Sequence, residues 1–164
     1  MTRINEEFVV NGDFVMGNLD GWIYLDKDKH KVMEYEAQRN CVVQLPAPPE
    51  ESLNQYFWAG PGTYRLSFTH RATDENGIPQ DVRTIHAGGI SYVDRNGMGH
   101  STTVLLVSKL EWDTTSRDVT ITQDHPPVEV HIGVMNIDNS TEKRDQEYVE
   151  SPFAITDISF LKIS

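Results

Sequence analysis

The residue types that most often carry catalysis or bind metal are present in this chain, but their spacing marks no reactive site. The six histidines are scattered, and no two have the close spacing of a zinc motif such as H-x-x-x-H. No G-x-S-x-G motif marks a nucleophilic serine, and nothing singles out a pair of carboxylates for glycoside hydrolysis. The sequence therefore predicts a protein that is not an enzyme, with a hydrolase as the weaker alternative.

Cys41 is the only cysteine, which excludes an internal disulfide. It lies in the apolar, strand-like stretch 40–45, where a small buried core residue is expected. A catalytic thiol needs a neighbouring base, and the local sequence offers none.

Aromatic residues offer a different chemistry, which is binding by flat faces. If Phe57 is the inward residue of its strand, then Tyr56 and Trp58 point outward by alternation. An exposed Tyr–Trp pair could stack on the apolar side of a sugar ring, or it could be covered by a loop or a partner subunit.

Four further residues are candidate ligand contacts. Arg65 and Arg71 lie on the polar face of the next strand, which could neighbour the Tyr–Trp pair or could simply be solvated. His86 and Tyr92 flank Gly88–Gly89, which we interpret as a bulge or a place of close approach.

These residues lie on short strands separated by turns. In 64–71 the apolar and polar residues alternate with the two-residue period of a half-buried strand, and 128–135 shows a similar pattern. Further strands are expected at 8–10, 23–25, 32–45, 81–93, 102–110, 119–122 and 153–163, a helical turn at 50–53 and a loop at 136–150. No segment keeps a helical period over three turns, so the sequence predicts one all-β sandwich domain over residues 1–164.

The glycine-punctuated stretch 11–22 precedes most of these strands. Gly12, Gly17 and Gly21 are placed where a positive φ or a close backbone approach would cost little. Phe14 and Trp22 are the expected anchors of this loop to the core.

The same stretch carries a family resemblance. Asn11-Gly-Asp-Phe14, Gly17 and Gly21-Trp22 resemble the opening signature of jelly-roll carbohydrate-binding modules of the galactose-binding-domain-like superfamily. Residues 55–68, 110–112 and 155–160 resemble later segments of that signature, in the same order. The resemblance implies a two-sheet antiparallel jelly-roll β-sandwich with neighbouring terminal strands. It also implies a non-catalytic role in binding a glycan on a sheet face or in the loops at one end.

The resemblance also implies a structural calcium ion, for which this chain is poorly equipped. In many relatives an acidic residue follows the first Phe and helps an Asp of the last strand to hold the ion, but here Val15 stands at that position. Asp157 matches the closing Asp, so the expected ligands are Asp157, carbonyls near Asn11, and Asp13.

Charge limits the remaining classes of partner. The net charge of −11 repels phosphate backbones and anionic lipids, so we expect neither nucleic-acid binding nor membrane association. No run approaches the roughly 20 apolar residues of a membrane span, and no cleavable leader is visible at the start. The expected setting is either the cell interior or export by a leaderless route.

Two functional hypotheses remain from the sequence. The first is a lectin-like module that binds carbohydrate through Tyr56, Trp58 and neighbouring polar groups. The second is a structural or assembly protein in which the same aromatic pair mediates self-association or docking to a larger complex.

Overall fold

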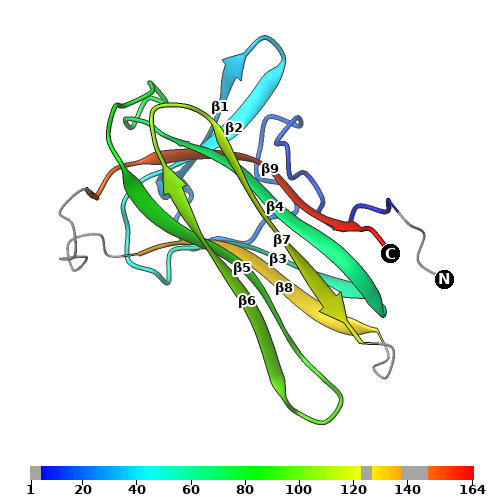
Figure 1. Ribbon diagram of the computed structural model, residues 1–164. Coiled ribbons are helices and arrows are strands. Elements are labelled where there is room, and N and C mark those ends of the chain that lie inside the picture. The colour runs from blue at the N-terminus through cyan, green and yellow to red at the C-terminus, as the bar shows by residue number, and fades with distance from the viewer. Residues whose placement is uncertain (1–4, 123–126, 138–147) are drawn as a thin grey trace.

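A computed structural model describes residues 5–122, 127–137 and 148–164, which form two antiparallel sheets packed face to face (Figure 1). The order of the five-stranded sheet is β1 (His30–Glu36), β2 (Arg39–Gln44), β9 (Phe153–Lys162), β4 (Gly62–Ala72) and β7 (Asp113–Ile121). The order of the four-stranded sheet is β3 (Leu53–Ala59), β8 (Val128–Asn136), β5 (Thr84–Val93) and β6 (Gly99–Ser108). The predicted jelly-roll β-sandwich is confirmed. Within the described residues, no helix is long and apolar enough to cross a bilayer.

Alternation along the strands builds the core between the sheets. On β4 the side chains of Tyr64, Leu66 and Phe68 are fully buried, while Arg65 between them is exposed. The inner face of the four-stranded sheet supplies the opposing layer, including Val130, Ile132 and Val134 on β8 and Leu106 on β6. The two-residue period that predicted these strands therefore also identifies the buried residues.

The prediction of a strand at 8–10 is wrong, because side chains satisfy much of the backbone there. The amides of Val9 and Phe160 both donate to Glu7 Oε1, and Val10 donates to Gln55 Oε1. In the backbone, Glu7 and Leu161 of β9 form an isolated bridge and not part of a ladder. The strand expected at 23–25 is likewise reduced to one bridge, between Ile23 and Asn54.

Residues 11–22, which we call the opening clasp, attach the start of the chain to β9. Phe14 and Trp22 are buried with their ring centroids 5.9 Å apart, as predicted. A Cβ on Gly12 would lie 2.0 Å from the carbonyl oxygen of Ile158, whose amide donates to Gly12 O over 3.0 Å. Gly17 and Gly21 have φ of +73° and +90°. The glycines thus serve both predicted purposes.

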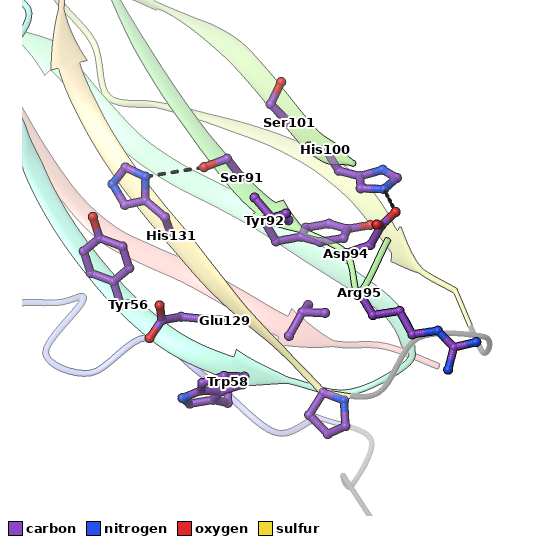
Figure 2. A pocket seen from close by; sticks show the side chains of 14 residues that line it. Tyr56, Trp58, Ser91, Tyr92, Asp94, Arg95, His100, Ser101, Glu129 and His131 are labelled. Carbon is purple, nitrogen blue, oxygen red and sulfur yellow. Dashed lines mark hydrogen bonds and ion pairs between the residues drawn. The ribbon is translucent and has the colours of Figure 1, made fainter. Parts of the chain in front are cut away.

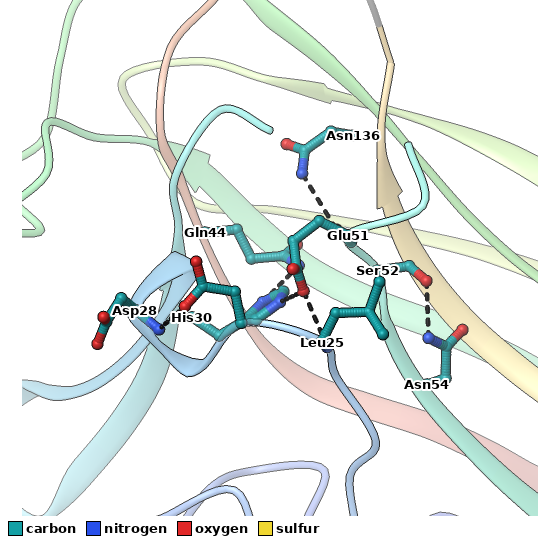
Figure 3. A network of polar contacts seen from close by, with 9 residues as sticks. Leu25, Asp28, His30, Gln44, Glu51, Ser52, Asn54 and Asn136 are labelled. Atoms are coloured by element: carbon teal, nitrogen blue, oxygen red, sulfur yellow. Dashed lines mark hydrogen bonds and ion pairs between the residues drawn. The ribbon is translucent and has the colours of Figure 1, made fainter. Parts of the chain in front are cut away.

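A buried polar network positions the start of β3 (Figure 3). His30 Nε2 lies 3.0 Å from Glu51 Oε2, and Gln44 Nε2 donates to His30 Nδ1 over 3.0 Å. Asn136, at the end of β8, donates to the Glu51 carbonyl. Glu51 lies in a turn closed by its amide on Pro48 O, not in the helical turn expected at 50–53; the short 3-10 helix lies instead at Lys27–Lys29.

This network stabilises the ionised form of Glu51 relative to the protonated acid. Burial acts to raise the pKa of Glu51, but hydrogen bonds from His30 and from the amides of Asp26 and Leu25 outweigh it, so the pKa is lowered. The network ties β1 and β2 of one sheet to β3 and β8 of the other.

Candidate functional site

The outer face of the four-stranded sheet contains a hollow of about 800 Å³ at the end where β3 finishes (Figure 2). Side chains from all four strands and from the β5–β6 turn line it. The lining includes Tyr56, Trp58, Ser91, Tyr92, Asp94, Arg95, His100, Glu129 and His131.

Strand register brings two aromatic–polar pairs together on this face. Tyr56 is the Cα partner of His131, and Trp58 is the Cα partner of Glu129. Tyr56 and Trp58 are 51% and 64% exposed, so both large rings present surface to solvent. The prediction that these two side chains point outward is confirmed, since Leu53 and Gln55 on the opposite parity are buried.

His131 is fixed at the centre of the hollow by contacts on three sides. Its ring stacks on Tyr56, with centroids 4.8 Å apart and planes at 17°. Because the Asn54 amide nitrogen donates to Ser52, the Asn54 oxygen faces His131 and accepts from Nε2 over 2.6 Å. Ser91 Oγ lies 3.4 Å from Nδ1. Burial lowers the pKa of His131, so the imidazole is neutral near pH 7. The contacts of the ring hold Asn54 Oδ1 and Ser91 Oγ in place.

Two glycines lie side by side on the neighbouring part of the outer face. Gly89 on β5 and Gly133 on β8 are Cα partners, and Asn54 lies opposite Gly133. A Cβ on Gly133 would lie 2.8 Å from Asn54 Oδ1, and one on Gly89 would lie 2.6 Å from the Thr102 carbonyl oxygen. The Asn54 amide therefore occupies the space in front of Gly133, which is buried, and the partly exposed backbone of Gly89 lies beside it.

The far side of the hollow is formed by a rigid turn. Asp94 accepts from the amides of Asn96 and Met98 through Oδ1, and its Oδ2 lies 2.8 Å from His100 Nε2. The His100 ring stacks on Tyr92, with centroids 4.7 Å apart. Asp94 is thus committed to the turn, and its carboxylate is buried.

The predicted ligand residues do not all meet at this hollow. Tyr56, Trp58 and Tyr92 line it, although Tyr92 is only 7% exposed and packs with the core. His86 is 2% exposed and stacks on Phe153, with centroids 3.6 Å apart. Since β5 runs through Gly88–Gly89 without a shift in register, the even-numbered side chains of β5 all face the core. Of the two alternatives for these glycines the bulge is wrong and the close approach is confirmed, because a Cβ on Gly88 would lie 2.7 Å from the Phe68 ring.

The expectation that Arg65 and Arg71 neighbour the Tyr–Trp pair is wrong, because β3 and β4 belong to different sheets. Arg65 pairs with Asp118 of β7 at 3.1 Å. Arg71 lies over the Trp112 ring at 5.3 Å and donates to Leu110 O. Both arginines therefore stabilise the other side of the sandwich.

Glu129 and His131 were not among the predicted site residues, although the sequence contained a signal for them. They occupy the polar positions of the alternating stretch 128–135, so they had to face outward. What the sequence lacked was the pairing of β8 with β3, which brings them beside Trp58 and Tyr56.

The structure brings together the three residues that were expected to hold a calcium ion, but they offer few oxygen ligands. Asn11, Asp13 and Asp157 border one small depression. Asn11 Nδ2 donates to the carbonyls of Asn18 and Asp20 over 3.0 Å each, and its buried Oδ1 has no hydrogen-bond partner among the described residues. The described part of the chain holds no group of three or more His, Cys, Asp or Glu side chains suited to a metal. The side chains here are two carboxylates and one amide, fewer than the six to eight oxygen ligands that calcium prefers, and calcium binding stays a prediction.

Comparison with solved structures identifies the fold. The chain superposes on the tandem CBM22-1-CBM22-2 domain of Paenibacillus barcinonensis Xyn10C with a TM-score of 0.65, at 13% identity, covering 98% of this chain and 50% of that one. It superposes on TmCBM61 in complex with β-1,4-galactotriose with a TM-score of 0.59, at 17% identity, covering 96% and 99% of the two chains. It also matches the enzymatically active domain of bacteriophage CBA120 tailspike protein 4 with a TM-score of 0.58, at 14% identity, covering 96% of this chain but 21% of that one.

These matches place the chain in the class of jelly-roll β-sandwiches found in carbohydrate-binding modules. No protein-family model matches the sequence, and no curated protein is significantly similar to it. At these identities the likeness establishes the fold, and the ligand must be inferred from the hollow itself.

Proposed function

We propose that this protein binds a carbohydrate chain, without turnover, on the outer face of its four-stranded sheet. The observation that carries the proposal is the exposure of Tyr56 and Trp58 beside a hollow of about 800 Å³. Flat aromatic faces bind the apolar side of a pyranose, and fixed polar groups bind its hydroxyls. His131 and Ser91 line the hollow and supply such groups in a preorganised arrangement, which reduces the entropy cost of binding.

The ligands of similar structures support this assignment. TmCBM61 was solved with β-1,4-galactotriose, and the CBM22-1 domain of Xyn10C is described as xylan-binding. The hollow also favours binding over hydrolysis, because Asp94 is buried in its turn and is engaged by two amides and His100. A glycosidase needs two carboxylates free to act as acid and as base or nucleophile.

Affinity electrophoresis against a panel of soluble neutral polysaccharides tests the proposal. We expect at least one polymer to retard the wild type. Trp58→Ala should weaken that binding by about 30-fold, because truncating a central aromatic anchor costs about 2 kcal/mol. Tyr56→Ala should also weaken it. Tyr24→Ala, which removes a partly exposed aromatic residue outside the hollow, is the matched control and should bind as the wild type does.

Self-association through the same aromatic pair is the rival outcome of this experiment. If no polymer retards the wild type, while sedimentation shows an oligomer that Trp58→Ala dissociates, the assembly role replaces carbohydrate binding.

A further inference from the structure

We propose that the hollow selects a glycan that carries protonated amino groups, with an ammonium bound between Tyr56, Glu129 and Trp58. This inference deepens the proposed function and depends on it, because it names the chemical class of the sugar. We call these three residues the carboxylate–aromatic trio.

The geometry of the trio is set by β3 and β8. Glu129 is directly opposite Trp58 in the ladder, and Tyr56 is its diagonal neighbour on the same face. All three side chains are exposed. In Figure 2 the Glu129 carboxylate turns into the space between the Tyr56 and Trp58 rings. A cation placed there could make a charge-assisted hydrogen bond to the carboxylate and also contact the faces of two rings.

Glu129 has no counter-ion in the part of the chain that the structure describes. Within the described residues it makes no hydrogen bond or ion pair. Arg95 also lines the hollow, but it comes from the β5–β6 turn, and Figure 2 shows its guanidinium directed away from Glu129. His131 is held neutral by burial, with both ring nitrogens near polar neighbours, so it does not neutralise the carboxylate either.

The whole-chain charge acts in the same direction. At a net charge of −11 the protein repels uronate or sulfated glycans and attracts cationic ones over a longer range. The long-range term is not specific to the hollow, so the experiment must separate it from the contribution of Glu129.

Three β-1,4-linked hexamers that differ only at C2 provide the test: glucose with a hydroxyl, N-acetylglucosamine with a neutral amide, and glucosamine with an ammonium. Calorimetric titration is carried out at low salt and at a pH that protonates the sugar amine. We expect the glucosamine hexamer to bind about tenfold more tightly than the glucose hexamer, the combined size of an exposed ion pair and a cation–π contact. The preference should shrink in about 0.5 M salt, because salt at that concentration strongly screens exposed charges.

Glu129→Gln keeps the shape of the side chain and removes its charge. We expect it to reduce the tenfold preference to about twofold or less, whereas Glu111→Gln, which removes an equal charge from an exposed site outside this hollow, should keep the preference. Equal reductions in the two variants would show that only the net charge acts, and would overturn the inference.

The two proposals fail in distinguishable ways. Equal affinity for the glucose and glucosamine hexamers, with binding lost in Trp58→Ala, overturns the amine selectivity and leaves carbohydrate binding intact. The absence of binding to all three hexamers also overturns the amine selectivity, and the neutral polysaccharide panel then decides the proposed function separately.

Discussion

Two buried histidines should make the sandwich sensitive to mild acid. His70 is fully buried between Ser108 and Thr115, and burial lowers its pKa to about 4. His86, stacked on Phe153, has its pKa lowered to about 3, by burial first and then by the nearby His70. Both imidazoles are therefore neutral in the folded state over a range in which an unfolded chain would protonate them.

The sign follows from proton binding. An unfolded histidine titrates near pH ~6.5, so between about pH 6.5 and pH 4 the unfolded state binds more protons than the folded state. The free energy of unfolding therefore decreases as the pH is lowered through this range. Each histidine contributes about 1.4 kcal/mol per pH unit, so the pair should remove about 4 kcal/mol between pH 6 and pH 4.5. That is a large part of the stability of an ordinary domain, which is about 5–15 kcal/mol.

Urea unfolding at half-unit pH intervals measures this loss, provided that the m-value stays constant. His70→Gln removes one titrating group, so the slope of stability against pH should fall by about half, whatever the absolute stability of the variant. A wild-type stability that is flat between pH 6 and pH 4.5, or a slope that His70→Gln leaves unchanged, would refute the reasoning.

Other perturbations test the elements that hold the sandwich together. Glu51→Ala leaves His30 and the Leu25 amide without their acceptor, so it should lower the free energy of unfolding in urea by about 2–4 kcal/mol. The exposed control Glu50→Ala should change it by no more than about 0.5 kcal/mol. Equal effects of the two variants would contradict a structural role for the network. Gly12→Ala should destabilise by at least about 2 kcal/mol because its Cβ meets a backbone carbonyl, and Gly99→Ala, which meets nothing within 4 Å, is the control. Chelation by EDTA should leave the melting temperature unchanged, since hydrogen bonds and packing hold the opening clasp; a drop restored by calcium would reverse that conclusion.

The sequence predicted the sandwich because its strands carry unambiguous alternation. The strand at 64–71 and the stretch 128–135 each bury one parity of side chains, and the anchors Phe14 and Trp22 were recognisable from their glycine-rich setting. The strand expected at 8–10 failed because periodicity does not reveal that a glutamate or glutamine side chain will accept the backbone amides.

The candidate site was only half predictable, for reasons of pairing. The sequence of the turn at Gly60–Gly62 is compatible with a hairpin within one sheet and with a connection between the two sheets. In the structure it connects β3 of one sheet to β4 of the other. Arg65 and Arg71 consequently lie on the opposite side from Tyr56 and Trp58. Conversely, Glu129 and His131 lie more than 70 residues from the aromatic pair in the chain, and only the β3–β8 ladder brings them together.

The hollow and the acid-sensitive core are coupled through β5. Its odd-numbered residues Gly89 and Ser91 form part of the outer face, while His86 and Tyr92 on the other parity pack inward. A one-residue slip of this strand would turn His86 to the outer face and would place Gly88 or Ile90 at the position that Gly89 now holds. In the observed register the His86 ring stacks on Phe153 on the inner side of β5, while Gly89 pairs with Gly133 on the outer side.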